Sequence, residues 1–173
     1  MKLANEIFLD IETTGLLPWH GNQVTCICAK TENGTNIKLS NINETTLIKL
    51  FLHWLHENTK GKTYTLVTFN GKIFDIPFIM ARCVIGADSS KETALFLLDY
   101  PHIDIFEEIQ KLIGKRLSLN TVAKLLGCTP KSGDGLNAIK LWEKGKYDEL
   151  QKYCFQDVLT TEEVYLKWMN LHK

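Results

Sequence analysis

The chain has 173 residues, of which 45% are hydrophobic and 23% are charged. These proportions are ordinary for a globular protein and exclude disordered, collagen-like and coiled-coil chains, and the length predicts one domain over residues 1–173. Twenty basic residues balance twenty acidic ones, so the formal net charge is zero. A chain of this charge does not hold nucleic acid by bulk positive charge, although a local basic groove remains compatible with it.

The sequence predicts a cytoplasmic protein with no membrane partner. No apolar run approaches the roughly 18 residues that span a bilayer, and two acidic residues interrupt the first apolar stretch, which excludes a signal-peptide pattern. The cysteines are odd in number and lack the spacing of a zinc knuckle, so we expect reduced, mostly buried thiols. They are Cys26, Cys28, Cys83, Cys128 and Cys154.

The first half of the chain contains three predicted strands and a helix, over residues 6–11, 23–30, 35–39 and 44–57. The dipeptide Asn33-Gly34 separates the second strand from the third and is typical of a hairpin turn. Asn43 is the expected N-cap of the helix, whose apolar residues recur at helical spacing.

The second half alternates further elements, with strands over 64–68 and 102–105 and helices over 75–85, 106–113, 119–126 and 147–169. Ser118 and Gly127 have the residue types that begin and end a helix. A polar loop is predicted over 129–136. Because strands and helices interleave, we predict an α/β fold with a mixed sheet flanked by helices.

Asp10 and Glu12 lie two residues apart in the apolar stretch Phe8-Leu9-Asp10-Ile11-Glu12. Alternate residues of a strand share a face, so both carboxylates should point the same way from a central strand. Two such groups repel each other and lose hydration unless a cation neutralises them, and Mg²⁺ or Mn²⁺ prefers oxygen ligands. A polar face at the edge of the sheet is the alternative.

Two later pairs of polar residues are ambiguous by themselves. Asn70 and Asp75 lie between a predicted strand and a predicted helix, where a turn residue and a first-turn acid are common. Tyr153 and Asp157 are four residues apart in a helix and therefore share one face. Their phenol and carboxylate are expected at one small site, and the alternative is a half-buried tyrosine beside a solvated aspartate.

The order of the three groups is more informative than any one of them. The patterns D-x-E-T-T-G-L from Asp10, N-x-x-x-F-D ending at Asp75 and Y-x-x-x-D ending at Asp157 resemble the three motifs of the DEDD superfamily of 3′–5′ exonucleases. That superfamily has the RNase H-like fold. Tyr153 resembles the DEDDy branch, since Lys152 stands where the DEDDh branch would carry a histidine. The chain is most similar to stand-alone relatives of the proofreading exonuclease domain of family B DNA polymerases.

The resemblance implies a metal-dependent exonuclease that releases nucleoside 5′-monophosphates from single-stranded 3′ ends, with DNA favoured over RNA. Two Mg²⁺ or Mn²⁺ ions would be the cofactors, bound by Asp10, Glu12, Asp75 and Asp157. Tyr153 would orient the attacking water, because a phenol with an ordinary pKa of about 10 accepts protons poorly at neutral pH. The resemblance places substrate contacts at Thr13, Thr14, Leu16, Asn70 and Phe74. Phe74 is equally expected in the core.

Two other classes of function compete with an enzyme. One is a catalytically inactive RNase H-like module that binds nucleic acid or protein, and the other is a structural metal-binding domain. The presence of all four carboxylates and the tyrosine favours the enzyme. Any polymerase or repair partner would be a separate protein that the sequence does not identify.

Overall fold

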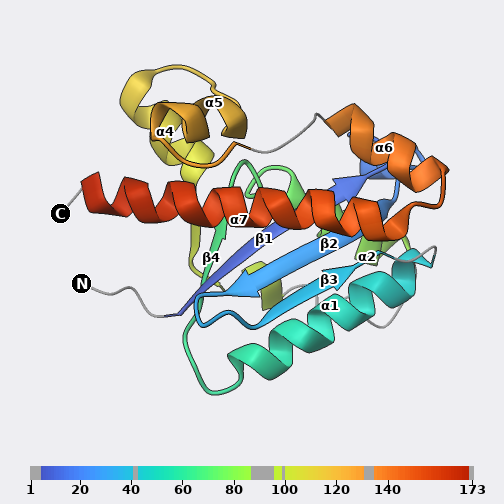
Figure 1. Ribbon diagram of the computed structural model, residues 1–173. Coiled ribbons are helices and arrows are strands. Elements are labelled where there is room, and N and C mark those ends of the chain that lie inside the picture. The colour runs from blue at the N-terminus through green and yellow to red at the C-terminus, as the bar shows by residue number, and fades with distance from the viewer. Residues whose placement is uncertain (1–4, 41–42, 87–95, 99, 131–134, 172–173) are drawn as a thin grey trace.

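The computed structural model describes residues 5–40, 43–86, 96–98, 100–130 and 135–171. Within these residues five strands form a mixed sheet in the order β3-β2-β1-β4-β5, with β1 at its centre (Figure 1). The strands are β1 (Glu6–Thr13), β2 (Val24–Thr31), β3 (Asn36–Leu39), β4 (Thr65–Thr68) and β5 (His102–Asp104). The first three are antiparallel neighbours, whereas β4 and β5 run parallel to β1. The predicted α/β class is confirmed.

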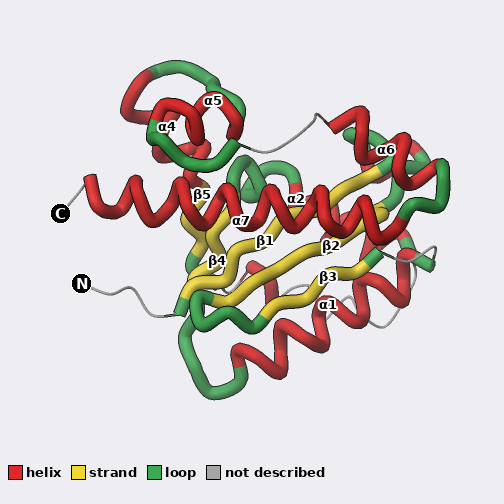
Figure 2. Tube along the Cα trace, viewed as in Figure 1, coloured by secondary structure: helices red, strands yellow, loops and turns green. Residues whose placement is uncertain are grey.

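Helices cover both faces of the sheet (Figure 2). They are α1 (Glu44–Thr59), α2 (Asp75–Ile85), α4 (Ile105–Ile113), α5 (Leu119–Leu125), α6 (Gly135–Glu143) and α7 (Tyr147–Leu171), with short 3-10 turns at Pro18–His20 and Phe96–Leu98. Helices α1 and α2 pack on one face, and α4 to α7 contribute to the core on the other. In the polar loop predicted over 129–136, residues 131–134 lie outside the described residues, and α6 already begins at Gly135.

The alternation of β1 explains why two separate cores form. Ile7, Leu9 and Ile11 point into the core with α1 and α2, while Phe8 packs in the core that α7 covers. Phe8 meets Tyr165 of α7 with ring centroids 5.6 Å apart. The central strand is therefore buried on both faces over Glu6–Leu9, while its polar residues Asp10, Glu12 and Thr13 are half-buried.

Local capping signals explain where several helices begin. The Asn43 side chain accepts a hydrogen bond of 2.9 Å from the Thr46 backbone N–H, and Ser118 Oγ accepts one of 3.2 Å from the Thr121 N–H. Both predicted caps are confirmed, because the side-chain oxygen satisfies an N–H that has no partner inside the helix. Among the described residues no helix combines the length and apolar character needed to cross a bilayer.

Candidate active site

Asp10 and Glu12 are half-buried on the face of β1 that α7 covers. Strand β2 pairs with one side of β1 and β4 with the other, so the alternative of an edge strand is wrong. Across the antiparallel pairing, Asp10 lies opposite Cys28 and Glu12 opposite Cys26. These two neighbours carry no positive charge.

The Asp75 carboxylate takes the place of a strand partner for the end of β1. Strand β4 pairs with β1 only over Glu6–Phe8, and beyond that point the Ile11 N–H donates to Asp75 Oδ1 at 3.0 Å. Burial raises the pKa of Asp75 to about 7, and the charges of Asp104 and Asp157 add to the increase. The side chain is therefore an interior group bound to the central strand, rather than a solvated first-turn acid.

Tyr153 and Asp157 lie on the part of α7 that packs against β1. Both are buried, with exposed fractions of 8% and 4%, so the alternative of a solvated aspartate is wrong. Between them, Cys154 Sγ lies 3.5 Å from Asp10 Oδ2 and 3.4 Å from the Asp10 carbonyl oxygen. The charge of Asp157 also raises the pKa of Asp75, the first residue of α2. Side chains of all three motifs thus lie at β1, with Cys154 of α7 against Asp10 and Asp75 of α2 bound to the Ile11 N–H.

Asp104, at the end of β5, holds the turn that carries the second motif. Its Oδ1 accepts from the Asn70 N–H at 2.8 Å, and its Oδ2 accepts from the Lys72 N–H at 2.9 Å. The same Oδ1 accepts from the Phe106 N–H at 3.1 Å and so caps α4. The position before a helix gives a sequence signal for the cap, but the contact with residues 70–72 needs the sheet to bring β4 beside β5.

The donor set fits hard divalent cations. Carboxylate oxygens of Asp10 and Glu12 lie within 4.8 Å of each other. Asn70 Oδ1 is buried and has no hydrogen-bond partner among the described residues. The charges of Asp104 and Asp157 help to raise the pKa of Asp75, and a divalent ion such as Mg²⁺ or Mn²⁺ would favour its ionised form.

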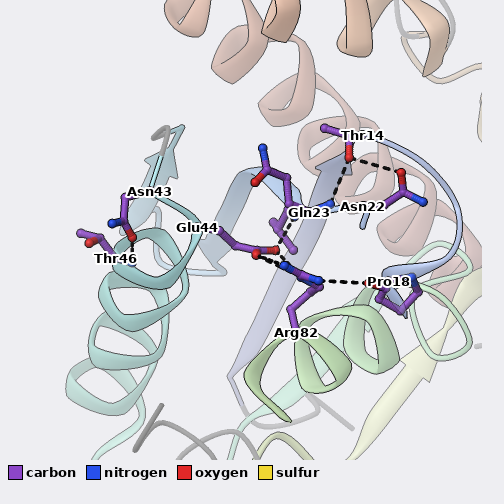
Figure 3. Close-up of polar contacts among 9 residues, drawn as sticks. Thr14, Pro18, Asn22, Gln23, Asn43, Glu44, Thr46 and Arg82 are labelled. Atoms are coloured by element: carbon purple, nitrogen blue, oxygen red, sulfur yellow. Dashed lines mark hydrogen bonds and ion pairs between the residues drawn. The ribbon is translucent and has the colours of Figure 1, made fainter. Parts of the chain in front are cut away.

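The loop after the first motif is held in place by polar contacts (Figure 3). Thr14 Oγ1 accepts from the Gln23 N–H at 3.0 Å, and Thr13 Oγ1 donates to the Gly15 carbonyl at 2.7 Å. Both threonine hydroxyls therefore already bind the protein's own backbone. Any contact of this loop with a nucleotide through hydroxyl groups would have to share these bonds.

Arg82 of α2 connects the loop to α1. It forms an ion pair with Glu44 in which Nη2 lies 2.6 Å from Oε2, and its Nη1 donates to the Pro18 carbonyl at 3.0 Å (Figure 3). Glu44 Oε1 in turn accepts from the Val24 N–H at 2.7 Å. Sequence reasoning missed this network, since its members lie in different elements far apart in the chain.

The remaining predicted substrate residues differ in exposure. Leu16 is 77% exposed, and Trp19, a residue of the same loop that is not among the predicted substrate contacts, is 65% exposed, so this loop presents apolar surface. Phe74 is half-buried and packs on Phe78, with ring centroids 5.6 Å apart. Asn70 has φ +70° and its carbonyl accepts from the Phe74 N–H at 3.2 Å, so it shapes the turn as well as carrying the buried oxygen.

Comparison with known protein families identifies the superfamily to which the chain belongs. Residues 7–169 match the family described as the RNase_H superfamily. The chain belongs to the RNase H superfamily. Members of this superfamily are typically nucleases that bind nucleic acid and use divalent metal ions. No curated protein matches the chain.

A solved structure confirms the RNase H-like fold. The family B DNA polymerase from the hyperthermophilic archaeon Pyrobaculum calidifontis aligns with a TM-score of 0.78 and 17% identity. The alignment covers 96% of this chain and 25% of the polymerase, so the chain spans about a quarter of that protein. At this identity the likeness concerns the fold, and the activity has to be argued from the site.

Proposed function

We propose that the chain is a metal-dependent 3′–5′ exonuclease of the DEDDy type that acts on single-stranded 3′ ends. The observation that supports this most directly is the meeting of three motifs around β1. Cys154 Sγ, 3.5 Å from Asp10 Oδ2, marks the contact of α7 with β1, and the hydrogen bond from Ile11 to Asp75 marks that of α2. A domain that only binds nucleic acid or protein would gain nothing from four acidic side chains buried or half-buried around its central strand, because burying such charges costs stability.

In this proposal Asp10, Glu12, Asp75 and Asp157 hold two divalent ions, Mg²⁺ or Mn²⁺. Such ions supply a water nucleophile at neutral pH and stabilise the charge that develops on the phosphate. The fixed carboxylates set where the terminal phosphodiester can lie, because β1, α2 and α7 form a rigid frame around them. The products would be a nucleoside 5′-monophosphate and a strand shortened by one residue.

Tyr153 acts as a positioning group in this proposal. Its side chain is 8% exposed and lies one helical turn from Asp157, so the phenol faces the same small space as the carboxylate. The hydroxyl would orient the attacking water by a hydrogen bond. Thr13, Thr14, Leu16, Asn70 and Phe74 would contact the terminal nucleotides, with Leu16 offering the most accessible apolar surface.

A labelled-strand assay tests the proposal. Single-stranded DNA and RNA of one sequence, labelled at the 5′ end, are incubated with the protein in Mg²⁺, in Mn²⁺ or in EDTA. We expect a ladder that shortens from the 3′ end, depends on metal and is faster on DNA. Asp10→Asn should remove the activity, while Asp148→Asn, which changes an exposed acid in the first turn of α7, should keep it.

The assay also separates the exonuclease from its main competitor. A protein that binds either strand without shortening it would be the inactive RNase H-like module, and equal cleavage by Asp10→Asn would point to a contaminating nuclease. We also propose that residues 1–173 form one domain, as the length predicts. A separate polymerase or repair protein would be its partner in any proofreading role.

A further inference from the structure

Three cysteine thiols meet beneath the carboxylates of β1. Cys26 and Cys28 are two residues apart on β2 and share the face that α7 covers, and Cys154 reaches them from α7. The three sulfur atoms lie within 4.8 Å of one another, and Cys26 Sγ is 3.8 Å from Cys28 Sγ. Each of the three side chains has an exposed fraction of 0%. The proposed exonuclease does not use any of these thiols.

One of the three thiols also touches the candidate active site. Cys154 Sγ is 3.5 Å from Asp10 Oδ2, and it belongs both to the thiol group and to a group with Asp10 and Glu12. Backbone carbonyls take the other short contacts, with Cys154 Sγ 3.4 Å from the Asp10 oxygen and Cys28 Sγ 3.6 Å from the Gln151 oxygen. Cys154 Sγ therefore belongs both to the group of three thiols and to the group of carboxylates, with Asp10 Oδ2 beside it.

The distance between the Cys26 and Cys28 sulfurs and the distance between the Cys154 sulfur and the Asp10 carboxylate agree with those of a tetrahedral zinc site. With Zn–S bonds of about 2.3 Å and Zn–O bonds of about 2.0–2.2 Å, tetrahedral angles place two sulfurs about 3.8 Å apart and a sulfur and an oxygen about 3.5 Å apart. The corresponding separations are 3.8 Å between Cys26 and Cys28 and 3.5 Å between Cys154 and Asp10. Three thiolates and a carboxylate carry the same total charge as the four thiolates of a structural zinc site.

We propose that Cys26, Cys28, Cys154 and Asp10 form a binding site for a thiophilic divalent ion, with Zn²⁺ as the physiological candidate. Thiolates select zinc over magnesium, because Mg²⁺ prefers oxygen donors. Binding releases the thiol protons and leaves every sulfur with a partner. A second consequence rests on the proposed function. Zn²⁺ bound to Asp10 occupies a ligand of the catalytic metal ions and thereby inhibits the exonuclease.

Spectroscopy on the reduced, metal-free protein tests the site without any substrate. Titration with Co²⁺ should give a sulfur-to-cobalt charge-transfer band that saturates at one ion per chain, and added Zn²⁺ should displace the cobalt. Cys26→Ser, Cys28→Ser and Cys154→Ser should each weaken binding by more than about 100-fold, because a direct ligand matters more than the surrounding groups. Cys83→Ser and Cys128→Ser, which change buried thiols elsewhere, should leave the band unchanged.

A second measurement protects the test against variants that fail to fold. Zinc-edge X-ray absorption of the wild-type protein with one equivalent of Zn²⁺ should show three sulfur neighbours at about 2.3 Å. A shell of only nitrogen and oxygen, or a cobalt band that survives in Cys154→Ser, would overturn the proposal. The readout needs no nuclease activity, so the metal site and the exonuclease can fail independently.

Inhibition by Zn²⁺ is tested by comparing the wild-type protein with the Cys26→Ser variant. In the labelled-strand assay with Mg²⁺, one equivalent of Zn²⁺ should reduce wild-type activity at least about 10-fold, and a thiol-free chelator should restore it. The Cys26→Ser protein should lose this sensitivity while keeping its activity in Mg²⁺ alone. Equal inhibition of both proteins would mean that Zn²⁺ acts at the carboxylates without the thiols, and would overturn this part of the proposal.

Discussion

The Ile11 backbone N–H in β1 donates a hydrogen bond of 3.0 Å to the carboxylate of Asp75, the first residue of α2. A side chain thus completes the hydrogen bonding of the central strand where β4 no longer pairs with it. The bond connects the first exonuclease-like motif to the second, and it gives Asp75 a structural task beside its proposed catalytic one.

Two substitutions at Asp75 should separate these tasks. Asn keeps an oxygen that can accept from Ile11, so Asp75→Asn should fold normally but lose at least about 100-fold in exonuclease rate, since it removes a charge needed to bind metal. Asp75→Ala should lose the same activity and also about 1–3 kcal/mol of stability, because a buried N–H is left without a partner. Urea unfolding and the labelled-strand assay measure the two effects. Equal stability of the two variants would contradict the structural role.

Tyr153→Phe should lower the rate of strand shortening by about 10–100-fold while metal binding and folding are kept. The change removes only the hydroxyl, and a group that orients water contributes less than a general acid or base, whose contribution is about 100-fold or more. Metal binding is followed by calorimetry and turnover by the labelled strand. Tyr147→Phe, at the half-buried tyrosine that begins the same helix, is the matched control. Unchanged turnover would exclude Tyr153 from the reaction.

Leu16→Ala should raise the KM for single-stranded DNA several-fold and leave kcat and thermal stability nearly unchanged. Leu16 is 77% exposed, so its truncation removes little from the folded core, whereas a stacked or wedged apolar contact with a base is worth about 1–3 kcal/mol. Steady-state kinetics on a short oligonucleotide distinguishes these parameters. The control Leu171→Ala, at another exposed leucine, should change neither KM nor kcat.

Arg82→Met should destabilise the protein by about 3 kcal/mol, because it leaves the Glu44 carboxylate largely buried without its cation. The loss should be smaller in the double variant Glu44→Gln/Arg82→Met, where the uncompensated charge is gone as well. Since Arg82 also binds the Pro18 carbonyl, hydrogen exchange should accelerate over residues 14–23. Additive effects of the two substitutions would show that the ion pair contributes nothing.

The pH dependence of stability should carry a signature of Glu6. Burial raises the pKa of this carboxyl, and a side-chain hydrogen bond with Glu32 raises it further, although the Tyr165 hydroxyl donates to it at 3.1 Å. A pKa raised by folding means that the folded state binds the proton more tightly, so stability falls as pH rises through that pKa.

Glu6→Gln removes this titration and keeps an oxygen for Tyr165. The variant should therefore be more stable than wild type at pH 8, and the difference should disappear at pH values below the unfolded pKa of glutamate. Thermal unfolding at a series of pH values measures the difference. A gap that widens toward acidic pH would show that the folded state favours the ionised form instead.

The sequence by itself determined the elements and the faces on which the proposed catalytic groups lie. Period-two alternation puts Asp10 and Glu12 together on one strand, and the four-residue spacing puts Tyr153 and Asp157 together on one helix. Caps such as Asn43 are equally local, since the side chain and the N–H that it binds are three residues apart. These features depend only on neighbouring residues, so the pattern of the chain is enough to predict them.

Only the tertiary structure decided what lies against those faces. The bond from Ile11 to Asp75 spans 64 residues, the pair of Arg82 and Glu44 spans 38, and the contact of Cys154 with Asp10 spans 144. The cysteine spacing along the chain predicts no metal site, yet the pairing of β2 with β1 and the path of α7 bring three thiols together. Such contacts are fixed by sheet order and helix packing, which no local period encodes.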